Sequence, residues 1–306
     1  MARDLYAAQV ALLVRLLPII AQEEVFALKG GTAINLFYRN MPRLSVDIDL
    51  TYLPVRDRAE SLADIDETLD RIVAAATRDI PKLNAQRIEG GGGGATRIRA
   101  RLEGAEVKIE TSPVTRGVVH EPETRQVSPA VEEEFGFASI KVVSFEDLFG
   151  GKLHAAVDRQ HPRDLFDVKL LYENEGLTDA LFRTFLVYVA SSPRPVQELI
   201  KPSLSPLDEQ FAQEFVGMTS IPVTVDELAE TRERLLADIN ARLDEKTRNF
   251  LIGLHDGAPD FGAIGLPQAA NLPAVRWKLL NLRKLMTEQP QKHAEQKAKL
   301  LEKFSS

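Results

Sequence analysis

The 306-residue sequence contains no cysteine, so disulfide bonds, thiolate zinc sites and cysteine nucleophiles are all excluded. Because a cysteine-free chain suits a reducing compartment, we expect a cytoplasmic protein. Histidine is also scarce, with five residues, and neither an H-E-x-x-H nor a G-x-S-x-G motif occurs. His154 and His161 therefore do not predict a zinc site, and no serine nucleophile is indicated.

Positive charge and long hydrophobic runs are likewise in short supply. Lysine and arginine number 38 against 45 aspartates and glutamates, which gives a formal net charge of −7. A chain of this charge does not coat nucleic acid through its overall field, so any contact with nucleic acid must be local. Gln9 and Arg15 interrupt the apolar stretch Leu5–Ala21. That stretch is short for a membrane span, and we expect an amphipathic helix and no membrane partner.

The remaining composition is that of an ordinary globular protein, with 44% hydrophobic and 27% charged residues. The length favours about two domains or lobes. Strand patterns are confined to the first part of the chain, at residues 25–29, 45–53, 86–89, 95–102 and 106–111. Helices are predicted from the first residues to Pro18 and at 32–39, 58–80, 144–160, 162–174, 178–190, 206–216, 225–240, 244–252 and 274–304. The five glycines Gly90–Gly94 predict a mobile hairpin tip rather than a phosphate loop.

The segment from Phe26 to Pro54 carries the strongest functional signal, because a glycine pair precedes two aspartates spaced one residue apart. Gly30 and Gly31 lie between an apolar run and a predicted helix, where backbone N–H groups can face a phosphate. On a strand, Asp47 and Asp49 project from one face. Two carboxylates at one place suit Mg²⁺, which combines carboxylates with substrate phosphates. An ordinary turn followed by a strand is the alternative.

A second cluster spans residues 151–168. Lys152 and Arg159 share one face of the first predicted helix, lined by small residues, while Arg163 and Asp167 share a face of the next. Basic side chains among alanines indicate a triphosphate clamp. A buried ion-pair network that joins the two helices explains the same pattern.

Two further features have two interpretations each, and a third has one. Glu110 is either a third carboxylate beside the aspartate pair or a solvated strand residue. Arg97, Arg99 and Arg101 alternate with apolar residues and place three guanidinium groups on one strand face. They form either a stripe that follows a nucleic-acid backbone or a solvated sheet face. The lysine-rich segment Lys292–Lys303 is expected to be a solvated helix.

Taken together, several segments resemble the AbiEii/AbiGii family of nucleotidyltransferase toxins, which belongs to the polymerase-β-like nucleotidyltransferase superfamily. The resemblance runs from the first helix to about residue 285 and rests on ALKGGTAINLFYR, PRLSVDIDLTYLP, VKIE, GGKLHAAVDRQHPRDLFDV, the RP of Pro193-Arg194-Pro195, EFVGM and LPAVRWKLLNL. It implies an α+β fold, with a polymerase-β-like core and mixed sheet in residues 1–143. Residues 144–306 would form a mainly helical C-terminal lobe that contributes Lys152 and Asp167 to the active site.

The resemblance also implies residue roles. Gly31 and Thr32 match the element that holds the nucleotide phosphates, to which we add Gly30 and Arg163. Asp47 and Asp49 match the metal-binding pair of the family, and Lys152 matches its active-site lysine. Asp167 matches its later aspartate, with Asp164 as a lesser candidate. Glu110 matches the third carboxylate of the superfamily, which is also a metal-binding position.

The implied activity is transfer of a nucleoside monophosphate from a nucleoside triphosphate (NTP) to RNA, with Mg²⁺, or Mn²⁺ in its place, as the cofactor. The expected acceptor is the 3′ end of tRNA, so that translation is blocked, and Arg97, Arg99 and Arg101 are the candidate RNA contacts. The resemblance implies a winged-helix antitoxin as partner, in a toxin–antitoxin or phage-defence system. The alternatives are transfer to a protein or a small molecule, and a catalytically silent protein that binds the antitoxin.

Overall fold

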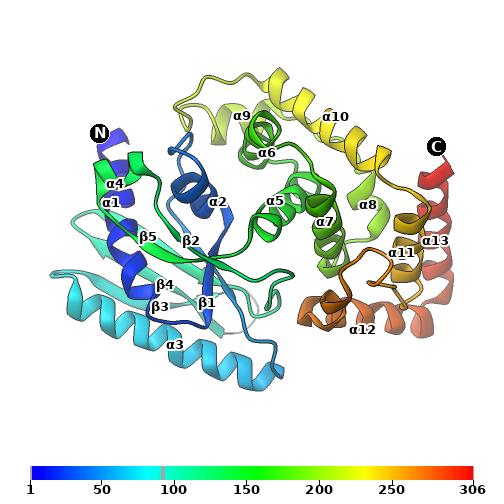
Figure 1. Cartoon of the computed structure of the whole chain (residues 1–306), viewed down its shortest axis with the longest axis horizontal. Coiled ribbons are helices and arrows are strands. Elements are labelled where there is room, and N and C mark those ends of the chain that lie inside the picture. Colours follow the sequence, from blue (N-terminus) through cyan, green and yellow to red (C-terminus); the bar gives the residue numbers. More distant parts are fainter. Residues whose placement is uncertain (1, 91–93, 306) are drawn as a thin grey trace. The chain divides into compact units, whose positions relative to one another are not determined.

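The computed structural model describes residues 2–90 and 94–305, which form two compact units (Figure 1). The first unit comprises Met1–Ser144 and the short segment Met218–Ile221, and the second comprises Phe145–Gly217 and Pro222–Ser306. The segment 218–221 joins the first unit through a bridge between Arg43 and Thr219. Its return to the first unit was not expected from the sequence.

The first unit is built on a seven-stranded mixed sheet with the strand order β3-β4-β5-β2-β1-β7-β6. The β2–β5 and β1–β7 pairs are parallel, and the other neighbouring pairs are antiparallel. All five predicted strands are present, and β6 and β7 are additional. The strand predicted over 45–53 begins only at Ile48, so Asp47 precedes β2 and, contrary to the prediction, does not share a strand with Asp49. The strands are β1 (Phe26–Lys29), β2 (Ile48–Tyr52), β3 (Asn84–Gly90), β4 (Gly94–Leu102), β5 (Ala105–Thr111), β6 (Glu123–Gln126) and β7 (Ser139–Val142).

Period-two burial explains the central strands. In β5, Val107 and Ile109 are fully buried, whereas Lys108 between them is exposed. The predicted hairpin tip Gly90–Gly94 falls between β3 and β4, whose ends pair at Gly90 and Gly94. Residues 91–93 of that tip lie outside the described residues.

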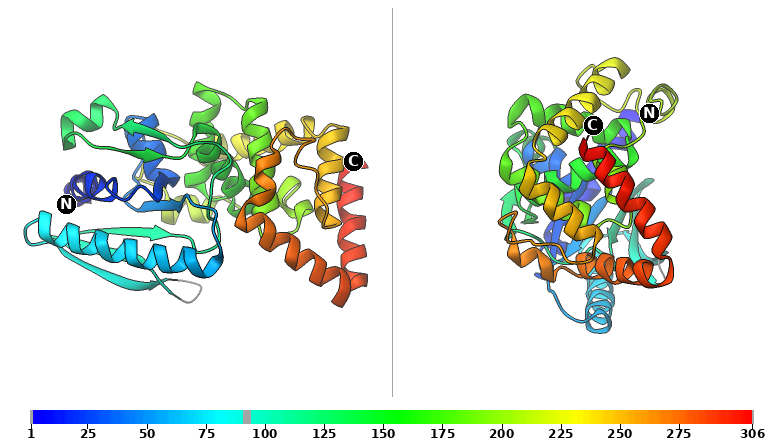
Figure 2. Two further views of the ribbon diagram at one scale, coloured as in Figure 1. Left: turned by 60° about the horizontal axis from the view of Figure 1, so that its bottom comes forward. Right: turned by 90° about the vertical axis from the view of Figure 1, so that its right-hand side faces the viewer.

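Helices α1 (Ala2–Ile20) and α3 (Arg58–Asp79) contact each other and pack on the sheet, α1 against β5 and β7 and α3 against β3 and β4 (Figures 1 and 2). The Tyr52 hydroxyl of β2 donates a hydrogen bond of 2.6 Å to Asp64 of α3. The alternation of a strand therefore turns Asp49 toward the opposite face of the sheet. Two shorter helices, α2 (Gly30–Ala33) continued by a π-helical turn at Ile34–Tyr38 and α4 (Pro129–Phe135), complete this unit.

The second unit is helical, as the sequence predicts. Its helices are α5 (Phe145–Arg159), α6 (Pro162–Asn174), α7 (Asp179–Ser191), α8 (Val196–Ile200), α9 (Asp208–Glu214), α10 (Val225–Ala241), α11 (Glu245–His255), a 3₁₀ turn (Pro267–Asn271), α12 (Pro273–Glu288) and α13 (Pro290–Ser305). Within residues 2–90 and 94–305, no helix has the length and apolar character needed to cross a membrane.

Two predicted helix boundaries are wrong, and both involve a proline. The helix predicted over 274–304 is divided at Gln289, whose φ of −139° and ψ of 60° are not helical, and Pro290 starts α13. A proline disfavours the helical conformation of the residue before it. Conversely, α1 continues past Pro18 to Ile20, although this proline lacks the N–H for one helical hydrogen bond and crowds the carbonyl four residues before it. This helix therefore ends two residues later than predicted. The missed elements β6, β7, α4 and α8 have four to seven residues each, too few to establish a period.

Leu28, fully buried in β1 near the middle of the sheet, provides a test of this core. We expect Leu28→Ala to lower the free energy of unfolding by about 2–5 kcal/mol, because the truncation leaves a cavity. Urea unfolding followed by circular dichroism measures the change. Val55→Ala is the control, since the side chain of Val55 is 48% exposed and its loss should matter by less than about 0.5 kcal/mol. Equal effects of the two substitutions would contradict the placement of β1 in the core.

Candidate functional site

The glycine pair forms the junction between β1 and α2. Gly30 has a φ of +76°, a conformation that residues with a side chain rarely adopt. A Cβ atom added to Gly30 would lie 2.4 Å from Oδ2 of Asp49, and one added to Gly31 would lie 2.5 Å from a terminal nitrogen of Arg43. The left-handed backbone favours glycine at position 30, whereas at Gly31 only the ends of the Arg43 and Ser45 side chains would have to move. The Asp49 carboxylate lies at the start of a helix, where backbone N–H groups carry partial positive charge.

The aspartate pair stands at the beginning of β2. Asp47 is exposed immediately before the strand, and Asp49 is half-buried within it. The hydroxyl of Thr32, 1% exposed, donates a 2.5 Å hydrogen bond to the backbone oxygen of Asp47 and lies 3.2 Å from Oγ of Ser45. In this structure Thr32 therefore fixes the segment that carries Asp47, and a phosphate that bound this hydroxyl would compete with that bond.

Four charged residues form a row across the sheet on adjacent strands. The register pairs Lys29 of β1 with Asp49 of β2, Asp49 with Glu110 of β5, and Glu110 with Arg97 of β4. Residues paired in register point to one face of a sheet. Arg97 completes the row with an ion pair of 3.0 Å from its Nε to Oε1 of Glu110. A cation at each end thus compensates two neighbouring carboxylates.

In the second unit, a buried ion-pair network joins α5 and α6. The Lys152 ammonium lies 2.8 Å from Oδ1 of Asp164 and 2.9 Å from Oδ2 of Asp167, and Arg159 contacts the other oxygen of Asp164 at 2.7 Å. Lys152 is 8% exposed, Asp164 3% and Asp167 0%. The structural alternative for this cluster is therefore confirmed as a network, and that network orients the lysine that sequence analysis proposed for a phosphate.

The first turn of α6 positions the helix that carries Asp164 and Asp167. His161 caps the helix by accepting a hydrogen bond of 3.1 Å from the backbone N–H of Arg163, and Pro162 occupies the first turn. The other ring nitrogen of His161 contacts Glu214 of α9 at 2.9 Å, so this histidine has a structural role. Arg163 itself is exposed on α6. Burial lowers the pKa of His154 on α5.

Comparison with known proteins was made on this basis. Residues 11–281 match the family model described as "Nucleotidyl transferase AbiEii toxin, Type IV TA system". The chain belongs to the AbiEii nucleotidyltransferase toxin family. Membership implies a nucleotide substrate and an antitoxin partner for this AbiEii protein. No curated protein matches the sequence.

A solved structure supports the fold of this AbiEii protein. It is MenT4, the nucleotidyltransferase toxin Rv2826c from Mycobacterium tuberculosis H37Rv, with a TM-score of 0.58, 17% sequence identity and coverage of 91% of this chain and 92% of that one. At such identity the likeness concerns the fold alone. The α+β fold with a nucleotidyltransferase-type core, a mixed sheet and a helical C-terminal part is thereby confirmed.

A pocket of about 250 Å³ adjoins the charged row of the AbiEii protein. The buried Thr111 hydroxyl on its wall has no hydrogen-bond partner among the described residues. A pocket of this composition offers a polar ligand both cationic and carboxylate contacts, with one hydroxyl still to be satisfied. Its walls are formed by Lys29, Asp49, Leu50, Thr96, Arg97, Glu110, Thr111, Ser112 and Pro113.

The donor set fits a divalent cation in part. Asp47 lies just before β2 and Asp49 lies within it. Mg²⁺ is commonly held by one or two carboxylates, with substrate phosphates and water as the other ligands. In the part of the chain that the structure describes, however, no three histidine, aspartate or glutamate side chains gather closely enough to hold a metal. Glu110 is paired with Arg97 instead. The two aspartates are therefore the better candidates, and Glu110 stays a prediction.

The three arginines of β4 have different surroundings. Arg97 pairs with Glu110, and Nε of Arg101 lies 2.5 Å from Oε2 of Glu106. Arg99 is opposite Lys108, and its buried Nε has no hydrogen-bond partner among the described residues. For Arg97 and Arg101, these ion pairs favour the interpretation that the arginines belong to a solvated sheet face on which carboxylates compensate their charge.

Sequence analysis missed Lys29 and Arg43. Burial lowers the pKa of Lys29, against the opposing effect of the nearby Asp49 carboxylate. The position of Lys29 directly before the glycine pair was the available signal. Arg43 is 4% exposed, and its guanidinium lies over Gly31, a contact between non-adjacent segments that no local pattern reveals.

Gly30→Ala tests the close approach of Asp49. We expect a loss of unfolding free energy of at least about 1–2 kcal/mol from the left-handed backbone alone, with a further loss because the new methyl group displaces the carboxylate. Gly104→Ala is the matched control, since Gly104 has a φ of +92° with no atom within 4 Å of an added Cβ. Thermal unfolding of both variants measures the difference, and identical losses would show that the carboxylate does not constrain Gly30.

Lys152→Met tests the buried network. Loss of the ammonium leaves Asp164 and Asp167 without their shared cation, and we expect a loss of about 3–5 kcal/mol in unfolding free energy. Replacing Asp167 by Asn in the same variant should restore part of it. Lys169→Met, which removes an exposed pair with Glu173 on α6, should cost less than about 1 kcal/mol. A Lys152→Met variant of normal stability would contradict the burial of this ion pair.

Proposed function

We propose that this AbiEii protein transfers a nucleoside monophosphate from an NTP to an RNA acceptor, the 3′ end of tRNA, and so inhibits translation. The observation that carries the proposal is the Asp49 carboxylate, held against the Gly30 backbone at a helix start and beside a pocket with two cations. Family membership supplies the reaction class. A toxin–antitoxin or phage-defence role, with a winged-helix antitoxin as partner, completes the proposal.

The first unit would bind the reacting phosphates. Asp47 and Asp49 would hold Mg²⁺, or Mn²⁺ in its place, which when bound neutralises phosphate charge and stabilises the departing pyrophosphate. The N–H groups after Gly30 and Gly31 face anions at the start of the helix. In the reaction, an oxygen of the acceptor hydroxyl forms a bond to the α-phosphorus, and the bond from that phosphorus to the pyrophosphate oxygen breaks.

The second unit would supply charge to the same reaction. We propose that Lys152, with Arg163 as an accessory cation, neutralises the triphosphate. Asp167 has two conceivable roles, orienting Lys152 or accepting the proton of the acceptor hydroxyl. Its full burial and its 2.9 Å ion pair with Lys152 favour the orienting role.

The acceptor is the part of the proposal that most needs an experiment. Arg99 is the arginine of β4 that we propose for RNA contact, since Arg97 and Arg101 have carboxylate partners. We expect that incubation with radiolabelled NTPs and total cell extract labels RNA, and that sequencing of RNA 3′ ends after brief induction identifies the nucleotide and the tRNA. Label in protein or in a small molecule would replace the RNA acceptor with one of those alternatives.

Asp49→Asn tests the metal-binding pair. The substitution preserves shape but removes the charge that a divalent cation needs, so we expect nucleotide transfer to fall by at least about a hundredfold. Asp66→Asn is the control, because Asp66 is exposed on α3 and pairs with Arg87 on the same unit. Transfer is measured with purified protein, labelled NTP and Mg²⁺, and unchanged transfer by Asp49→Asn would overturn the assignment.

Asp47→Ala separates the enzyme from a silent binding protein. If toxicity depends on catalysis, induced expression of Asp47→Ala should leave growth unaffected, because the exposed carboxylate contributes to the reaction and not to the core. Growth curves, with immunoblots to match expression levels, give the result. A variant as toxic as the natural chain would favour the silent antitoxin-binding protein.

A further inference from the structure

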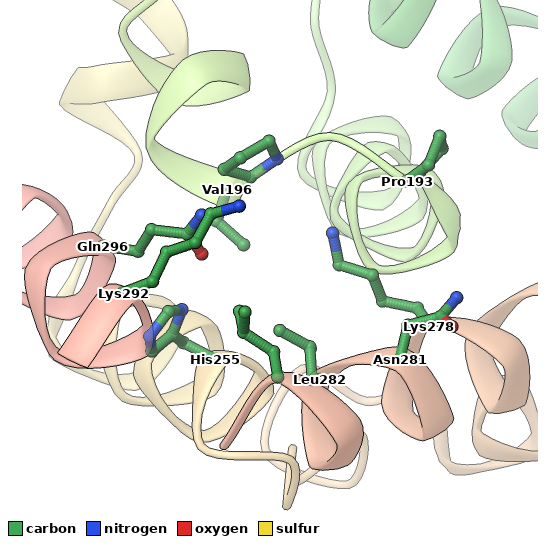
Figure 3. A pocket seen from close by; sticks show the side chains of 10 residues that line it. Pro193, Val196, His255, Lys278, Asn281, Leu282, Lys292 and Gln296 are labelled. Carbon is green, nitrogen blue, oxygen red and sulfur yellow. The ribbon is translucent and has the colours of Figure 1, made fainter. Parts of the chain in front are cut away.

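The last helix of the second unit lines two adjoining pockets. One, of about 210 Å³, lies among the turn at Pro193–Val196, α12 and α13 (Figure 3). The other, of about 370 Å³, lies between the end of α8 and the second half of α13. Gln296 lines both pockets, so they are neighbours along one face of the helix. We call the two together the α13 groove, lined on α13 by Lys292, Gln296, Lys299, Glu302 and Lys303.

Positive charge is concentrated in the α13 groove. Five lysines line it, whereas its carboxylates are only Glu198 and Glu302 among the lining residues. In a chain with a formal net charge of −7, this is a local reversal of sign. The lysines are Lys278 and Lys292 in the smaller pocket and Lys201, Lys299 and Lys303 in the larger one.

Lys278 shows that the charge in the smaller pocket is built into the fold. Its side chain is 6% exposed, and its ammonium donates a hydrogen bond to the backbone oxygen of Arg194. Figure 3 shows this ammonium directed toward the turn at Pro193. Burial lowers the pKa of Lys278 to about 8, against the opposing effect of Glu198. An anion in the pocket would offset the desolvation of this cation.

The shape of the groove selects among anions. Positions 292, 296, 299 and 303 recur every three or four residues, so they form one stripe on the helix. From position 292 to position 303 the helix rises eleven times by 1.5 Å, or about 16.5 Å, which is too long for one small anion. Lysine acts as a point charge toward phosphate, and no arginine lines the groove to read a base edge with two hydrogen bonds. These features fit successive phosphates of one strand.

We propose that the α13 groove binds the sugar–phosphate backbone of a single-stranded segment of the acceptor RNA. The inference rests on the proposed function for the identity of the polyanion, but the contact is made by the second unit alone. Phosphate contacts position a nucleic acid without reading its sequence. The groove would therefore contribute affinity for RNA and not selectivity between RNA sequences.

The test compares two double variants with the same change of charge. Lys292→Glu/Lys299→Glu alters two exposed lysines of the groove, and Lys246→Glu/Lys284→Glu alters two exposed lysines elsewhere in the second unit. Affinity of the full chain for a short fluorescein-labelled single-stranded RNA is measured by anisotropy at several salt concentrations. We expect the groove variant to bind the RNA at least tenfold more weakly. The plot of log affinity against log salt should also become less steep by about 1.4, since each of the two lost phosphate contacts accounts for about 0.7. The control variant should change little.

Three results would overturn the proposal. The first is equal weakening of RNA binding by both variants, which would show a general effect of charge. The second is an unchanged RNA affinity of the groove variant, and the third is groove-dependent binding of polyglutamate that is as tight as the binding of RNA. Circular dichroism and thermal unfolding verify that both variants fold. The proposed function fails separately, through absence of nucleotide transfer to RNA by the natural chain. If transfer occurs and the groove variant binds RNA normally, the groove proposal alone is lost.

Discussion

The contact between the Asp49 carboxylate and the Gly30 backbone is the constraint on which the candidate site depends. It requires a residue without a side chain, in a left-handed conformation, where β1 ends and the next helix begins. Since Asp49 also neighbours Glu110, two like charges are held on adjacent strands, and Lys29 and Arg97 stand at either side of them. Along the strand order β4-β5-β2-β1, the side chains in this row are thus positive, negative, negative and positive. A nucleotide or cation that approached would meet this prearranged electrostatic field.

In the second unit, burial also holds charged side chains in fixed positions. An ammonium and two carboxylates among Lys152, Asp164 and Asp167 are almost fully removed from water, which is costly unless each charge has well-placed partners. Such a network is weak evidence for a gain in stability, but it leaves the lysine little freedom of orientation. A catalytic group needs that property, and the ion-pair and phosphate-binding interpretations of this cluster are therefore compatible.

Charge is distributed unevenly over a chain that is acidic overall. Sequence analysis placed the candidate RNA contacts on Arg97, Arg99 and Arg101, and the structure gives two of these arginines carboxylate partners. Lys292, Lys299 and Lys303 of α13, which the sequence suggested were merely solvated, line two pockets together with the buried Lys278. Whether a basic residue is available to a ligand thus depends on its neighbours in space and not on its spacing along the chain.

The class of fold and the family followed from the resemblance of several segments to the AbiEii/AbiGii family. The sequence by itself also determined the order of most elements, because burial periodicity, proline and glycine act over a few residues. It located the glycine pair, Asp47 and Asp49 for the same reason. Only the tertiary structure decided which charges meet. The commitment of Thr32 to the Asp47 backbone and the groove along α13 join segments that are separated in sequence. The free energy of such contacts depends on strand register, burial and helix packing, which no local pattern encodes.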